Sequence, residues 1–213
     1  MKLNKLKFVY IFIIVLLFIL FGISFAFNII NLRNNKDKSM ENIIFFGDSI
    51  TAGYDLNKYY SNKHIVNKGI SGNKTEDLLN RIETDVFQYN PSKVIVLIGI
   101  NDLTHGVDSD DILLNIESII NEIQLNRPKT KIYIESIYPV GVNRKDVDNK
   151  AIKDLNIKIK KLCKLSDVIY INVFDHLIDK EGNLKKTYTR DDLHLTNLGY
   201  LKVTSVLSEY VEE

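Results

Sequence analysis

From residue 41 onward, short apolar runs alternate with longer segments in which apolar residues recur every three or four positions. Short apolar runs rich in β-branched residues predict buried strands. Five are expected, at residues 43–46, 64–67, 94–98, 131–137 and 168–174. The third run, Val-Ile-Val-Leu-Ile, is unbroken, which is typical of a central parallel strand buried on both faces.

The segments between these runs have the spacing of amphipathic helices. Leu78, Leu79, Ile82 and Val86 share one side of a helix expected from Thr75 to about residue 89. Further helices are predicted at residues 108–126, from 148 or 149 to about 165, and from 196 to about 211, while residues 50–62 form a helix start or a loop. Strands alternating with helices predict an α/β domain whose mostly parallel sheet is covered on both faces. This pattern leaves the order of the strands open.

The first forty residues have a different pattern. Residues 8–27 are almost entirely apolar and carry no charge. Twenty helical residues cover about 30 Å, the thickness of a bilayer core. We therefore expect a short cytoplasmic start at residues 1–7, a transmembrane signal anchor at 8–27, a polar linker at 28–40 and an extracytoplasmic domain at 41–213. The alternative is a cleaved secretory signal, for which Ser24-Phe25-Ala26 is a weak cleavage site.

Charge and cysteine content narrow the function of the domain. The chain has 28 basic and 27 acidic residues, and six basic residues and one acidic residue lie in 1–38. The remainder therefore carries 22 basic and 26 acidic residues, a net charge of −4. This balance gives no support for nucleic-acid binding. Cys163 is the only cysteine, so no disulfide framework or cysteine-based zinc site is expected, and its place in an apolar helix predicts a buried side chain.

Ser49 follows the first predicted strand at the sequence Phe46-Gly47-Asp48-Ser49-Ile50. A serine between a strand and a helix lies at the carboxyl end of the strand, where open α/β sheets bind their ligands. The nearby helix N-terminus favours developing negative charge. Such a serine is a candidate nucleophile. The common alternative is that Ser49 only caps the helix.

Other polar residues stand where a serine hydrolase needs them. Acyl transfer to serine requires a base, a group that orients the base, and donors for the oxyanion. Gly72 lies in the loop after the second strand and Asn101 follows the third. Asp191 and His194 are three residues apart before the final helix, a spacing at which a carboxylate in a turn reaches its own histidine. Each residue also has a structural interpretation, as turn glycine, cap or solvated loop residue.

Four short motifs follow one another along the chain. They are Gly47-Asp48-Ser49-Ile50, Asn67-Lys68-Gly69-Ile70-Ser71-Gly72, Gly99-Ile100-Asn101-Asp102 and Asp191-Asp192-Leu193-His194. In this order they resemble the motifs of the SGNH-hydrolase (GDSL-like lipase/esterase) family, from about residue 42 to the end. Ile50 stands where leucine is usual. Asp192 stands where many members have glycine, which leaves the motif intact and adds a charge near the site.

The resemblance implies a three-layer α/β/α sandwich with a flavodoxin-like, five-stranded sheet. It implies that Ser49 is the nucleophile, His194 the base and later the acid, and Asp191 the residue that orients His194. The oxyanion hole would consist of the backbone N–H groups of Ser49 and Gly72 and the side chain of Asn101. Asp48 and Asp102 would hold loop backbone around the site. No metal and no organic cofactor is implied.

Three other histidines compete with His194 for the role of base. His64 begins a strand and so points away from the carboxyl edge of the sheet. His105 closely follows Asn101 and is a candidate for lining the substrate site. Asp175 and His176 are adjacent, and neighbouring side chains in an extended chain face opposite ways. Asp191 and His194 remain the better pair.

The leading hypothesis is a membrane-tethered serine esterase that hydrolyses a lipid ester, an acetylated surface sugar or a small soluble ester. An acyltransferase acting on surface glycans would use the same site with a different acceptor. A non-catalytic binding module using the same cleft is the third hypothesis. The acyl length, the alcohol part of the substrate and the oligomeric state stay open.

Overall fold

The structure is a computed structural model that describes residues 19–24, 42–61 and 64–212. The chain divides into two compact units, Met1–Met40 and Glu41–Glu213. In the first unit, residues 19–24 are helical, and Ile19, Leu20, Phe21 and Ile23 are exposed. The predicted cytoplasmic start, most of the predicted membrane span and the linker lie outside the described residues. Within the described ranges, no helix combines the length and apolar character needed to cross a membrane.

The second unit is built on one five-stranded sheet. Its strands are β1 (Ile43–Gly47), β2 (Ile65–Gly69), β3 (Lys93–Leu97), β4 (Lys131–Glu135) and β5 (Ile169–Ile171). The order is β2-β1-β3-β4-β5, and every neighbouring pair is parallel. This is the flavodoxin-like order. The five predicted strands are confirmed, although the fourth and fifth end earlier than the apolar pattern indicated.

The helices alternate with the strands. They are α2 (Ser49–Ala52), α3 (Leu56–Tyr59), α4 (Thr75–Asp85), α5 (Ile100–Thr104), α6 (Ser109–Asn126), α7 (Asn149–Leu165), α8 (Phe174–Leu177) and α9 (Asn197–Val211), with 3-10 turns η1 (Phe87–Tyr89) and η2 (Lys186–Tyr188). The helix expected to reach residue 89 ends at Asp85 and continues as η1, closed by Asn90 in the left-handed conformation at φ 44°. The pattern missed α5 and α8 because four or five residues are too few to show apolar positions recurring at helical spacing.

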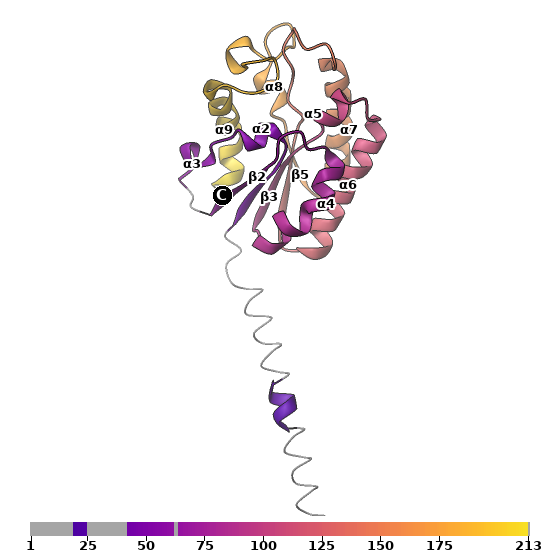
Figure 1. Cartoon of the computed structure of the whole chain (residues 1–213), viewed down its shortest axis with the longest axis vertical. Coiled ribbons are helices and arrows are strands. Elements are labelled where there is room, and N and C mark those ends of the chain that lie inside the picture. The colour runs from indigo at the N-terminus through magenta and orange to yellow at the C-terminus, as the bar shows by residue number, and fades with distance from the viewer. Residues whose placement is uncertain (1–18, 25–41, 62–63, 213) are drawn as a thin grey trace, which may run out of the picture. The chain divides into compact units, whose positions relative to one another are not determined.

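Helices cover both faces of the sheet (Figure 1). The row α4, α6 and α7 packs side by side on one face, and α9 and α3 lie on the other. Successive side chains of a strand point to opposite faces of the sheet, so the apolar core has one layer on each face. Phe45, Ile95 and Tyr133 are in register across three strands, and Tyr133 meets Tyr210 of α9.

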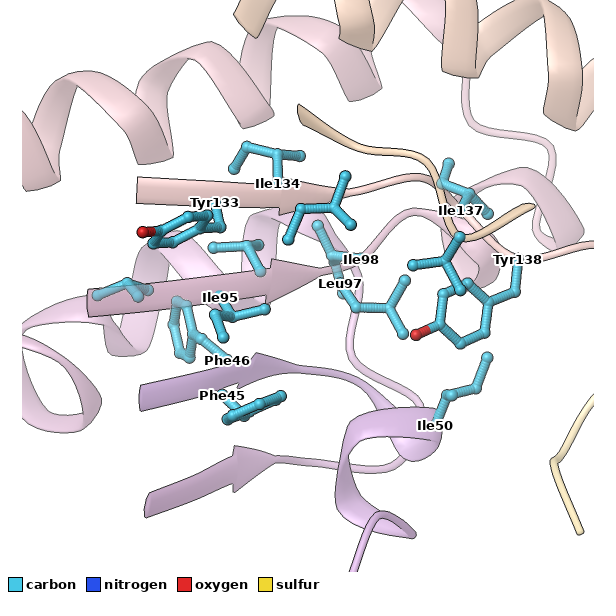
Figure 2. Packing of buried hydrophobic residues seen from close by; sticks show 14 of the residues in the cluster. Phe45, Phe46, Ile50, Ile95, Leu97, Ile98, Tyr133, Ile134, Ile137 and Tyr138 are labelled. Atoms are coloured by element: carbon cyan, nitrogen blue, oxygen red, sulfur yellow. The ribbon is translucent and has the colours of Figure 1, made fainter. Parts of the chain in front are cut away.

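The core continues past the carboxyl ends of the strands. Figure 2 shows apolar side chains running from Tyr133 and Ile134 along the sheet to Ile137, Tyr138 and Ile50 beyond it. Ile50 belongs to the short helix α2 and is buried. The segment that carries Ser49 is therefore fixed to the main core. From β1 the chain adds β2 on one side and then β3 on the other, so the strand order reverses between β1 and β3. This switch point at the carboxyl edge is where α/β sheets of this kind bind ligands.

Candidate active site

Ser49 is the first residue of α2 and is half-buried. The residue that caps this helix is Asp48, whose Oδ1 accepts a hydrogen bond from the backbone N–H of Ile50 at 2.9 Å. The interpretation of Ser49 as the helix cap is therefore wrong. Its hydroxyl is available for another partner.

That partner is His194. Ser49 Oγ lies 3.0 Å from His194 Nε2, and His194 Nδ1 lies 2.7 Å from Asp191 Oδ2. The structure thus brings together three residues that span more than 140 positions of the chain. The side chains of His194 and Asp191 are 42% and 53% exposed, so this hydrogen-bonded chain faces solvent.

A tight turn at residues 191–194 sets the geometry of the pair. Asp191 Oδ1 accepts the backbone N–H groups of Leu193 and His194 at 3.1 and 2.7 Å, and Asp192 adopts a left-handed φ of 67°. Partial burial raises the pKa of Asp191, but its hydrogen bonds with His194 and the turn backbone outweigh this and lower the pKa overall. The carboxylate stays ionised and can stabilise a positively charged imidazole.

The loop after β2 lies against the loop after β1. The backbone N–H of Ile70 donates to the carbonyl of Gly47 at 3.0 Å, and Gly69 approaches Ala52 so closely that a Cβ would collide with its backbone. Gly72, in the same loop, has a φ of +81°, which favours glycine. The Gly72 loop is thereby held next to the segment that carries Ser49.

Asn101 comes from α5, directly after β3. Its Nδ2 donates to the carbonyl of Asn73 at 2.9 Å, which ties the Asn101 turn to the Gly72 loop. Gly99, at φ +119°, allows the chain to turn from β3 into α5. Ser49, Gly72 and Asn101 therefore come from three adjoining loops at one edge of the sheet.

The two neighbouring aspartates are buried and bond loop backbone. Asp102 accepts two bonds from Thr75, one from the backbone N–H at 3.0 Å and one from the hydroxyl at 2.7 Å. Burial raises the pKa of Asp102. Burial also raises the pKa of Asp48, to about 7. Asp48 Oδ2 has no hydrogen-bond partner among the described residues.

Arg81 of α4 is a site-supporting residue that the sequence did not indicate. Its Nη2 donates to the carbonyl of Gly47 at 2.9 Å and its Nε to Asn73 Oδ1 at 2.7 Å. Asp85 pairs with the remaining nitrogen at 2.6 Å. One guanidinium thus joins the two loops that carry Ser49 and Gly72. In the sequence, an arginine among charged neighbours on a helix resembles any solvated residue.

The other histidines do not take the place of His194. His105 is exposed, and its Nδ1 lies 2.7 Å from the carbonyl oxygen of Asn101. The Asp175 carboxylate accepts a bond from Asn172 at 2.6 Å. Among the residues that the structure describes, no cluster of three or more histidine, cysteine, aspartate and glutamate side chains is arranged for a metal ion.

The sequence comparisons assign the chain to a family. The model of the GDSL-like Lipase/Acylhydrolase family matches residues 45–202, which contain every residue of the hydrogen-bonded chain. The chain belongs to this family. It is a GDSL-type hydrolase that acts on ester bonds.

The relatives of this GDSL hydrolase include proteins named for different enzymes. The chain is 30% identical over 188 residues to an N-acylneuraminate cytidylyltransferase of Escherichia coli, covering 87% of this chain but only 44% of that protein. It is 26% identical to the platelet-activating factor acetylhydrolase IB subunit alpha2 of Rattus norvegicus, over 83% of this chain and 78% of the relative.

Solved structures show the same fold. A Streptococcus pneumonia structure named after platelet activating factor matches with a TM-score of 0.77 and 31% identity, over 87% of this chain and 99% of that one. An acetyl xylan esterase matches with a TM-score of 0.67 and 27% identity, over 80% and 99% of the two chains.

Proposed function

We propose that this GDSL hydrolase is a serine esterase that forms an acyl-enzyme on Ser49. The observation that carries the proposal is the continuous hydrogen-bonded chain from Ser49 Oγ through His194 to Asp191. His194 Nε2 accepts the serine proton as Oγ attacks the ester carbonyl. It then returns the proton to the leaving alcohol, and water repeats the sequence to release the acid.

Asp191 acts through His194. A carboxylate at Nδ1 keeps the proton on that nitrogen, so Nε2 is the basic atom that faces Ser49. The lowered pKa of Asp191 supports this role because an ionised carboxylate stabilises the imidazolium. Its two backbone hydrogen bonds hold the carboxylate in place before the reaction begins.

The oxyanion that forms during attack needs donors. The backbone N–H groups of Ser49 and Gly72 and the Asn101 amide are the proposed donors, since the three adjoining loops carry them to one edge of the sheet. Asn101 Nδ2 bonds Asn73 in the free protein and would share or exchange that bond when substrate binds. Removing one such donor typically raises the barrier by about 3–4 kcal/mol. Asp48 and Asp102 would fix the loops that present the donors.

Ser49→Ala tests the assignment of the nucleophile. We expect p-nitrophenyl acetate hydrolysis to fall at least about a thousandfold with an unchanged unfolding curve, because the nucleophile is lost and no packing changes. Ser118→Ala, which removes an exposed serine hydroxyl on α6, is the matched control. Full activity in Ser49→Ala would overturn the proposal. A fluorophosphonate that leaves the wild-type Ser49 unlabelled would instead favour a binding module.

Acyl transfer is the second candidate, favoured by the exposure of the His194 and Asp191 side chains. An open site lets an alcohol or sugar hydroxyl compete with water for the acyl-enzyme. Measuring how the acyl group divides between water and an added sugar separates an esterase from an acyltransferase.

Residues 8–27 are proposed as a membrane anchor that leaves the hydrolase domain outside the cytoplasm. The support is their almost entirely apolar sequence, which carries no charge and is long enough for a bilayer. The substrate would then be a lipid, glycan or small ester outside the cytoplasm.

A further inference from the structure

Asp192 lies in the turn between Asp191 and His194 in a backbone conformation that few residues adopt. Its φ of 67° is in the left-handed region, which glycine occupies freely and aspartate tolerates better than most other residues. The mechanism proposed above uses the side chains of Asp191 and His194 but not the one between them. The contacts of Asp192 extend to another loop of the domain.

Asp192 is bonded to the loop that follows β4. The backbone N–H of Gly141 donates to the Asp192 carbonyl at 2.8 Å, and Asn143 Nδ2 donates to Asp192 Oδ2 at 3.1 Å. The carboxylate also packs against Gly141. A Cβ on that glycine would lie 1.9 Å from Asp192 Oδ1, and the next nearest atoms are Cγ and Cβ of the same side chain. The main chain and the side chain of one residue therefore join the turn to this loop.

The segment that contacts Asp192 is itself held in place. The side chain of Asn149, the first residue of α7, bonds both the N–H and the carbonyl of Val140, each at 2.8 Å. The N–H of Leu184 donates to the same carbonyl at 3.0 Å, and both Val140 and Gly141 are buried. The loop after β4 therefore offers Asp192 a fixed support.

The turn has few other polar links to the rest of the domain. Hydrogen bonds among residues 189–194 fix the shape of the turn, because they join its own members. Among the described residues, the partners of positions 191–194 outside that segment are Ser49, Gly141 and Asn143. The last two are bonded by Asp192, and the buried Leu193 adds apolar contact with the core. The hydrogen bonds that place the turn therefore depend on Asp192.

We infer that Asp192 is a positioning residue whose carboxylate fixes the turn to the loop after β4 and so sets where His194 Nε2 lies relative to Ser49 Oγ. This inference rests on the proposed esterase function and adds a residue to it. Misplacing a reacting group by about 1 Å can lower a rate about a hundredfold. Because Asp192 acts through His194, its substitution should change kcat more than KM.

Gly141→Ala in the full chain tests the contact between the turn and the loop. The new Cβ would overlap the Asp192 side chain, so we expect the turn to be displaced and kcat for p-nitrophenyl acetate to fall about a hundredfold. Asp192→Gly removes the three nearest atoms that this Cβ would meet. We therefore expect the double variant to recover to the level of Asp192→Gly alone, about tenfold below wild type. A double variant no more active than Gly141→Ala would overturn the inference.

Asp192→Asn separates the position of the side chain from its charge. Asparagine tolerates a left-handed φ and keeps an oxygen that can accept a bond from Asn143. We expect its kcat to stay within about twofold of wild type, whereas Asp192→Gly lowers kcat about tenfold with little change in KM. Asn143→Ala should lower kcat about threefold alone and cause no further loss in the Asp192→Gly variant, because the bond is already absent. Wild-type kcat in Asp192→Gly would overturn the inference. These variants add no atom to a buried segment, so they provide a test even where Gly141→Ala fails to fold.

Asp167→Gly is the matched control. Asp167 also has a left-handed φ, 55°, and is exposed, but it leads from α7 into β5 at the edge of the sheet opposite Ser49. We expect this variant to keep the wild-type kcat and KM. Ser49→Ala, assayed in parallel, distinguishes the two proposals. Activity in Ser49→Ala would overturn the esterase mechanism, whereas an inactive Ser49→Ala beside an unrelieved Gly141→Ala would overturn only the role of Asp192.

Discussion

Single residues near Ser49 differ sharply in their exposure to water. Asp191 and His194 are open to solvent, whereas Asp48, next to Ser49 in sequence, is completely buried. Glu135 at the end of β4 is also buried, and its carboxylate accepts a hydrogen bond from Tyr138. Burial raises the pKa of Glu135 to about 8, with a contribution from the charge of Asp48. Two buried carboxyl groups, Asp48 and Glu135, therefore resist ionisation, whereas the exposed Asp191 is ionised.

Asp48→Asn tests the cost of ionising a buried carboxyl. The pKa of Asp48 is about 7 in the folded chain and about 3.9 in an unfolded one, so its contribution to stability is full below about pH 4 and is lost as pH rises to about 7. Over this range each pH unit costs the wild type about 1.4 kcal/mol from this residue. Asparagine cannot ionise. We expect urea unfolding from pH 5 to 8 to show the variant gaining stability relative to wild type as pH rises.

The exposed Asp175→Asn is the control, since it removes a carboxylate that water already solvates. A stability difference between Asp48→Asn and wild type that does not change with pH would contradict the raised pKa.

At the scale of elements, two helices hold the Ser49 segment from opposite faces of the sheet. From α4, Arg81 joins Gly47 to Asn73 and stacks on Phe46 at 4.5 Å. From α9, the Tyr200 hydroxyl donates to the carbonyl of Ile50 at 2.8 Å. Because α2 has only four residues, its position depends on these contacts more than on its own helical hydrogen bonds.

Arg81→Lys should lower kcat about tenfold with little change in KM. A single ammonium cannot bond Gly47 and Asn73 together in the planar geometry of guanidinium, so the loops that carry Ser49 and Gly72 lose their common support. Arg127→Lys is a matched control, because Arg127 bonds the backbone carbonyl of Phe87 and stacks on its ring away from the site. Equal kinetic effects of the two substitutions, measured with p-nitrophenyl acetate, would count against a positioning role for Arg81.

Tyr200→Phe should lower the free energy of unfolding by about 1–3 kcal/mol, because the buried carbonyl of Ile50 loses its donor. The ring remains stacked on Tyr54, at 5.0 Å between centroids, so packing is retained. Urea unfolding measures the loss. Tyr188→Phe changes a half-buried tyrosine of η2 and serves as the control. An unchanged stability of Tyr200→Phe would show that α2 does not depend on this bond.

On the scale of the whole molecule, the parallel sheet determines where the chemistry lies. The carboxyl ends of β1, β2 and β3 are adjacent because the strand order places β1 between the other two. The turn at residues 191–194 comes to the same edge before α9 runs back along the sheet. The proposed anchor belongs to the other unit, Met1–Met40, and the hydrolase unit contains the complete set of candidate site residues.

A chain that begins at Glu41 should hydrolyse p-nitrophenyl acetate within about twofold of the full chain, since residues 1–40 supply none of the proposed site. The full chain should sediment with membranes and require detergent for release, because an apolar segment of this length is stable in a bilayer. Fractionation followed by an activity assay measures both. Recovery of the full-length gene product as a shorter, soluble protein would favour signal cleavage over anchoring.

The sequence by itself determined the alternation of strands and helices, the five strands, and the family to which the motifs point. These features depend on local spacing and on residue types such as the unbroken run in β3, which neighbouring residues suffice to reveal. The sequence also identified three candidate catalytic residues from their positions at strand and helix ends: Ser49, Asp191 and His194.

Only the tertiary structure decided which of these residues meet and what supports them. The strand order, the hydrogen bond between Ser49 and His194 and the link made by Arg81 all depend on contacts between residues distant in sequence. Such contacts form when the apolar faces of different helices and strands pack together. The local sequence pattern of one element does not show which other element it packs against. An arginine that bonds two loops has the same sequence signature as one that faces water, and its function here follows from the packing of α4 on the sheet.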